Sequence, residues 1–295
     1  AVAVLANLRA LAWVIQAASH FQQPGGLARL SLTAIVDSLW KFWTDGQLTL
    51  QGLLMRLAER EATFEHSVAL SELPAAETLA LQDRPSQLPV RITTRNRVEF
   101  RHDLAAEWAR FQRLKEIADD TERWAALAQN PLWTGALRML GQYLLRERVN
   151  NQTAWDVAFG KLTSAQRASG LAVDILLDAL CLDPLAELLL TERVELLLAD
   201  GGALLNRLLQ RFHHIATVPS GQPHGLQVDP SFILYIEAQY RAPIVGRWPA
   251  VVRFLSSHRD RVAKLMSPIV ARLCERWLTT MPVELAPGVP MPFRK

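Results

Sequence analysis

One short stretch of this sequence alternates like a β-hairpin, whereas almost everything around it follows a helical period. Residues 90–93 and 97–100 alternate apolar and polar side chains across a polar turn at Arg95-Asn96. Such alternation is typical of half-buried antiparallel strands joined by a tight turn. The sequence therefore predicts a mainly α fold that accommodates one β-hairpin.

The segments before the hairpin read as helices. Apolar residues recur at helical spacing over residues 1–21 and 30–46, and "QQPGG" at 22–26 separates the two runs. Two shorter helices are expected within residues 48–66 and 73–84. Helices followed by one hairpin within about 70 residues are the outline of a winged-helix domain. We assign residues 1–45 to a helical segment that precedes this domain and residues 46–118 to the winged helix.

From about residue 119 to the end, we expect only helix. Four pairs of a capping residue and a proline mark expected helix starts, because proline is tolerated at the first helical position. These pairs are Asn130-Pro131, Asp183-Pro184, Asp229-Pro230 and Ser267-Pro268. Their spacing suggests stacked helical hairpins, so residues 119–295 are predicted to form an irregular HEAT-like or armadillo-like α-helical array.

Composition excludes several classes of protein. The 32 Lys and Arg residues nearly balance the 29 Asp and Glu residues, so the net charge of +3 gives no general polyanion-binding signature. The two cysteines, Cys181 and Cys274, lie far apart, which argues against a disulfide framework and favours a reducing cytoplasm. No apolar run reaches the roughly 18 residues that a membrane span needs. We expect a cytoplasmic protein with no membrane partner.

No complete catalytic motif is visible. The phosphate loop, the dinucleotide-binding glycine motif, the serine-hydrolase elbow and the zinc-protease motif do not occur in the 295 residues. His213, His214 and His224 do not have the spacing of a metal site, since neighbouring helical residues point in different directions. Structural or surface roles are expected for these histidines, and no metal ligand or catalytic residue is assigned.

His102 has a more informative context. It follows the second predicted strand and opens a helix whose buried face includes Leu104, Trp108 and Phe111. An imidazole beside the first unsatisfied N–H groups of a helix is well placed to donate a hydrogen bond to a phosphate oxygen. The other interpretation of the same pattern is that His102 packs the hairpin against the helix.

The segment "FRHDLAAEWARFQRL" resembles the Met-His-Asp motif that ends the winged-helix domain in the STAND class of signalling ATPases, the NACHT and NB-ARC relatives. The upstream "SLWKFW" is similar to the aromatic helix before that winged helix, and "ANLRALAWVIQA" is similar to the first lid helix after the nucleotide-binding core. Arg101 stands where the motif has methionine. The residues that match the bacterial form of the motif are Phe100, His102, Asp103, Leu104, Glu107, Trp108, Ala109 and Arg110.

The resemblance implies a nucleotide switch. His102 would contact the β-phosphate of bound ADP, with ADP and ATP as the cofactors, and Arg9 would approach the nucleotide from the lid. The phosphate loop of the parent ATPase would lie before residue 1. The helical array would bind a protein or phage-derived ligand in bacterial antiphage or stress signalling, with a homo-oligomer forming on activation.

Two other interpretations stay open. Winged helices often bind DNA, and the hairpin carries Arg91, Arg95, Arg97 and Arg101; against this, the predicted groove-reading helix "ELPAAETLALQDR" is acidic. Alternatively, the chain is a helical scaffold for a protein partner and no nucleotide is involved.

Overall fold

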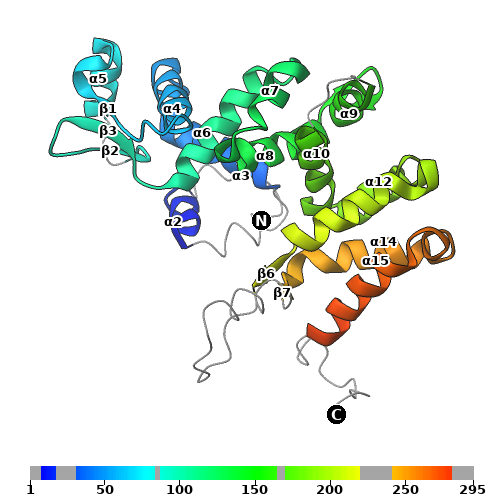
Figure 1. The fold of residues 1–295 in the computed structure, drawn as a ribbon. Coiled ribbons are helices and arrows are strands. Elements are labelled where there is room, and N and C mark those ends of the chain that lie inside the picture. Colours follow the sequence, from blue (N-terminus) through cyan, green and yellow to red (C-terminus); the bar gives the residue numbers. More distant parts are fainter. Residues whose placement is uncertain (1–7, 18–30, 84–86, 165–169, 220–240, 281–295) are drawn as a thin grey trace, which may run out of the picture. The chain divides into compact units, whose positions relative to one another are not determined.

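The computed structural model describes residues 8–17, 31–83, 87–164, 170–219 and 241–280 (Figure 1). These residues are mainly helical with a few short antiparallel strand pairs, which confirms the predicted fold class. The chain divides into two compact units, residues 1–179 and 180–295, and each is described by itself. The expected boundaries near residues 45 and 118 stay predictions.

The first unit is built around α6. This helix packs against α4 and α8, and α3 also contacts α8. The helices of this unit are α2 (Leu8–Gln16), α3 (Leu32–Thr44), α4 (Leu48–Glu61), η3 (Leu70–Glu72), α5 (Ala75–Asp83), α6 (Asp103–Glu116), α7 (Thr121–Leu127), η4 (Pro131–Trp133), α8 (Thr134–Leu144) and α9 (Ala154–Ser164), and α10 (Gly170–Leu182) runs into the boundary.

A three-stranded antiparallel sheet lies between α4 and α6 in the chain. The predicted hairpin forms as β2 (Val90–Ile92) and β3 (Arg97–Phe100), with Val90 opposite Phe100. A third strand, β1 (Val68–Ala69), pairs with β3 and gives the order β1-β3-β2. The elements follow in the order α4, β1, η3, α5, β2 and β3, and the winged-helix assignment stays a prediction. Two residues were too few for β1 to show an alternating pattern.

Helix α3 begins and ends where its sequence requires. The hydroxyl of Ser31 accepts a hydrogen bond from the N–H of Ala34 at 3.2 Å, which caps the first turn. Asp45 and Gly46 then adopt left-handed φ values of 49° and 74°, a common way to end a helix. The face between these ends buries Ile35, Leu39 and Trp43 in the core.

The expectation of nothing but helix after residue 119 was wrong in two places. Strands β4 (Arg148–Val149) and β5 (Gln152–Thr153) form a small hairpin, and β6 (Thr217–Pro219) pairs with β7 (Arg241–Pro243). Asn150 and Asn151 connect the first pair with φ values of 49° and 68°. Two left-handed residues define the hairpin turn that asparagine favours, so the Asn-Asn pair was a usable signal.

The four expected helix starts had different outcomes. Asn130 caps the 3-10 helix η4, where its side chain accepts a hydrogen bond from the N–H of Leu132 at 3.0 Å. The side chain of Asp183 accepts a hydrogen bond from the N–H of Leu185 at 2.9 Å, but within a turn, because α11 begins at Ala186 with Leu185 as its N-cap. Asp229-Pro230 lies outside the described residues. Ser267-Pro268 is not a helix start, because Pro268 lies inside α15 (Arg259–Thr280). Proline removes one hydrogen bond from a helix interior but does not always end the helix.

The second unit consists of a few packed helices. They are α11 (Ala186–Glu192), α12 (Val194–Ile215), η5 (Val245–Arg247), α14 (Trp248–Ser257) and α15. The α12 segment contains a non-helical break at Ala199–Gly202, in which Asp200, Gly201 and Gly202 have left-handed φ values. Trp248 is fully buried, stacks on Trp277 with ring centroids 5.8 Å apart, and donates a hydrogen bond to the carbonyl of Ala216 at 2.7 Å. Over the ranges that the structure describes, no helix is both long enough and apolar enough to cross a membrane.

Gly141 marks a close approach between α8 and α10. A Cβ atom there would lie 2.6 Å from the Cβ of Ala179, well inside van der Waals contact. We expect Gly141→Ala to destabilise the first unit by about 1–3 kcal/mol through overpacking. Gly160, inside α9, has no atom within 4 Å of the same added position, so Gly160→Ala should stabilise the unit by about 0.5–1 kcal/mol. Urea unfolding followed by circular dichroism measures both, and equal effects would contradict the close approach.

Candidate functional site

Three tryptophans from three helices meet at the start of α6. Trp43 of α3 stacks on Trp108 of α6 with centroids 5.7 Å apart and planes at 22°. Trp13 of α2 meets both edge-on, at 5.2 Å from Trp43 and 5.6 Å from Trp108. Each such contact contributes about 0.5–1.5 kcal/mol beyond the burial of apolar area. We call Trp13, Trp43 and Trp108 the tryptophan cluster.

His102 lies at the edge of the tryptophan cluster. Its ring is half-buried and meets Trp13 edge-on at a centroid distance of 6.1 Å. His102 is also the N-cap of α6, where its Nδ1 accepts a hydrogen bond from the N–H of Leu104 at 3.1 Å. An accepting nitrogen carries no proton, so the proton of the neutral ring is on Nε2. Among the described residues, no group accepts a hydrogen bond from Nε2.

The structure corrects one part of the expectation for this helix end. The sequence suggested that several unsatisfied N–H groups would add to an anion site beside His102. Two of them have partners, because the N–H of Leu104 binds Nδ1 and the N–H of Ala105 binds the carbonyl of His102 at 2.9 Å. These two N–H groups are therefore not free to bind an anion. The Nε2–H of His102 is the group that could meet a phosphate.

Arg9, the second residue expected to contact a nucleotide, belongs to α2. The side chain of Arg9 lies outside the described residues, so its contact with a nucleotide stays a prediction.

Three of the four hairpin arginines make contacts within the first unit, and Arg95 is exposed at the turn. Arg91 pairs with Glu99, with Nη2 and Oε1 2.6 Å apart. Arg97 donates to the hydroxyl and carbonyl of Ser67 at 2.7 and 2.6 Å, and Nε of Arg101 donates to the carbonyl of Val90 at 2.7 Å. Guanidinium groups used in this way are poorly placed to contact DNA phosphates. The arrangement therefore gives no support to the DNA-binding alternative.

Other motif residues face inward from α6. Arg110 is only 4 % exposed, and its Nη1 lies 3.7 Å from Oε2 of Glu61 on α4. Burial lowers the pKa of Arg110 and raises the pKa values of Glu61 and Glu107. The Glu107 carboxylate occupies the space in which a side chain at Gly135 would lie. Trp108, Arg110 and Glu107 therefore connect α6 to α3, α4 and α8, and sequence spacing alone could not identify these partners.

No metal centre is present in the part of the chain that the structure describes, since no three His, Cys, Asp or Glu side chains come together. His213 and His214 have ring centroids 5.8 Å apart, and His224 lies outside the described ranges.

Comparison of the sequence with protein-family models finds no matching family, and comparison with curated proteins finds no similar protein. The functional argument for this chain therefore depends on its residues and their geometry.

The capping role of His102 predicts a stability change. We expect His102→Ala to destabilise the first unit by about 1 kcal/mol, because the N–H of Leu104 loses its acceptor. His102→Ser should recover most of that loss, since a serine hydroxyl caps helices well. Urea unfolding of both variants measures the difference, and equal stabilities for the serine and alanine variants would argue against the cap.

Burial of Glu107 predicts that the stability of the folded protein depends on pH. Because burial raises the pKa of this carboxyl in the folded state, the folded protein binds more protons than the unfolded chain above the ordinary glutamate pKa. The contribution of Glu107 to stability is therefore most favourable below that pKa and is lost as pH rises through the raised value. We expect Glu107→Gln to gain stability relative to wild type between pH 4 and pH 7. Glu122→Gln, at an exposed site on α7, is the control for losing one negative charge, and a matching gain in this variant would refute the assignment.

Proposed function

We propose that this chain is the regulatory and ligand-sensing portion of a STAND-type NTPase switch, in which His102 senses bound ADP. The nucleotide-binding core that this requires, with its phosphate loop, lies outside these 295 residues. The role would be in bacterial antiphage or stress signalling in the cytoplasm. A homo-oligomer would form on activation.

The observation that carries the proposal is the orientation of the His102 ring. Its Nδ1 accepts a hydrogen bond from the N–H of Leu104, and its ring forms a T-shaped contact with Trp13, so both contacts favour one orientation of the ring. The remaining Nε2–H is a directed donor to an acceptor outside the described residues. A phosphate oxygen of ADP is such an acceptor, and a hydrogen bond to a charged group contributes about 1.5–3 kcal/mol.

The tryptophan cluster supplies a way to transmit the nucleotide state. Trp13 lies on the helix assigned to the lid, whereas Trp108 lies on the same helix that His102 caps. A change in the position of α2 would therefore disturb the packing around His102. If ADP favours one arrangement and a ligand on the helical array favours another, each must weaken the binding of the other by the same factor.

Retention of ADP by the longest natural polypeptide that contains these residues tests the proposal. Nucleotide released on denaturation is identified by chromatography, and the rate of ADP dissociation is measured with a fluorescent analogue. We expect ADP in the wild type and at least about tenfold faster dissociation from His102→Ser, which keeps the cap but loses the imidazole donor.

Arg95→Gln, at an exposed position of the hairpin turn, is the matched control and should leave ADP dissociation unchanged. Wild-type protein without nucleotide would favour the scaffold alternative. If ADP dissociates from His102→Ser at the wild-type rate, His102 has only a packing and capping role.

A further inference from the structure

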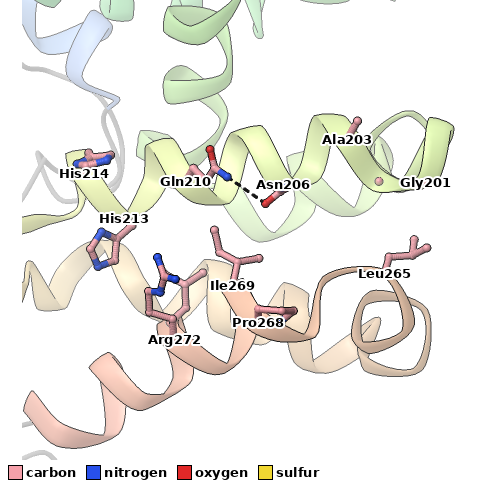
Figure 2. Close-up of a pocket in the computed structure, with 12 residues that line it drawn as sticks. Gly201, Ala203, Asn206, Gln210, His213, His214, Leu265, Pro268, Ile269 and Arg272 are labelled. Atoms are coloured by element: carbon pink, nitrogen blue, oxygen red, sulfur yellow. Dashed lines mark hydrogen bonds between the residues drawn. The ribbon is translucent and has the colours of Figure 1, made fainter.

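The second unit contains a groove between α12 and α15 that the proposed switch does not use. The groove has a volume of 580 Å³, within the usual range for small-molecule sites, and Figure 2 shows the side chains that line it. Residues of α12 between Gly201 and His214 form one wall, and Leu265, Pro268, Ile269, Arg272 and Leu273 of α15 form the other. Both walls belong to one compact unit.

One end of the groove is basic. The side chains of His213 and Arg272 point into the space between the two helices (Figure 2). Among the described residues, Arg272 has no ion-pair or hydrogen-bond partner, and no Asp or Glu lines the groove. Arg276 and Arg241 add positive charge close to His213. The field at this end favours an anion.

His213 adds a second, independent sign of a missing partner. Its Nε2 is buried and has no hydrogen-bond partner among the described residues. A buried polar atom left in this state costs free energy that a ligand could recover. Burial, together with the charges of Arg276, His214, Arg272 and Arg241, lowers the pKa of His213. The neutral ring has one N–H, and in the Nε2–H tautomer that group can donate to an anion without a second charge.

The other end of the groove is apolar and accessible. Leu265 is 45 % exposed, and Pro268 and Ile269 continue the same wall of α15. Ala203 of α12 also lines the groove, and Asn206 and Gln210, joined by a hydrogen bond of 3.4 Å, lie between the two ends (Figure 2). A suitable ligand therefore has a charged head and a short apolar body.

We propose that the groove between α12 and α15 binds a small amphipathic anion, with its carboxylate or phosphate head at Arg272 and His213 and its apolar body along Leu265 and Ile269. Binding at this groove is independent of the proposed switch. A role for this anion as the ligand that opposes ADP rests on the proposed function.

Calorimetric titration of the 295-residue chain tests this site with three probes: octanoate, acetate and octylammonium. We expect saturable binding of octanoate at one site. Acetate lacks the apolar body and octylammonium carries the wrong charge, so both should bind at least about tenfold more weakly. Equal affinity for octanoate and octylammonium would overturn the assignment of an anion head.

Two arginine variants locate the site on α15. Arg272→Gln should weaken octanoate binding about tenfold, because it removes a charged hydrogen-bond donor from the groove. Arg259→Gln is the control: its side chain is 81 % exposed on the same helix, near only Asp260 among the described ion pairs, and the change in net charge is the same. Equal weakening in both variants, or none in Arg272→Gln, would overturn the proposed groove.

Repeating the titration with octyl phosphate shows whether the groove prefers a phosphate or a carboxylate head group. A tighter octyl phosphate complex assigns the groove to phosphate esters and a tighter octanoate complex assigns it to carboxylates, and both support an anion site. No saturable binding of either probe would refute the site. No nucleotide enters these measurements, so their failure would leave the role of His102 in ADP retention unaffected.

Discussion

The stacking of Trp43 on Trp108 is the contact on which the arrangement of the first unit most depends. It fixes α6 against α3, and Trp13 closes the same cluster from α2. Because Trp108 is buried on one side of α6 and Arg110 on another, the helix has little freedom to rotate. His102 caps this helix and is therefore held in the same rigid arrangement. A donor held in this way loses little conformational entropy when a ligand binds.

The segment that resembles the Met-His-Asp motif has two kinds of residue. Trp108 and Arg110 are buried and make the contacts that hold α6, while Glu107 fills the space beside Gly135. His102 is half-buried and Asp103 is exposed. Most of the motif therefore has a structural explanation that needs no nucleotide. The argument for ligand recognition depends on His102, whose Nδ1 is used within the chain and whose Nε2 is not.

Local patterns in the sequence predicted much of the fold. The hairpin at 90–100 and the α3 helix followed from alternation and helical spacing, and the Asn130 cap followed from its proline neighbour. A strand of two residues, such as β1, is too short to show an alternating pattern. It forms because it pairs with β3, and that contact is not visible in the local sequence. The prediction of a helix start at Pro268 was wrong because a proline can also lie inside a helix that tolerates one missing hydrogen bond. Contacts such as Trp13 with His102 join residues about 90 positions apart, and one sequence contains no direct signal for them.

The cap geometry also limits how His102 could act in the proposed switch. Protonation of Nδ1 would remove the acceptor that caps α6, so a charged ring and an intact cap exclude each other. The neutral ring offers one N–H and can distinguish a nearby phosphate from its absence without changing its own charge. Its response would then follow the position of the phosphate and the lid. Two contacts of His102 could link α2 to α6 in such a response. Trp13 of α2 contacts the His102 ring, and the cap holds the same ring on α6. A movement of α2 that separates Trp13 from Trp108 would loosen His102 and, with it, the phosphate contact that we propose.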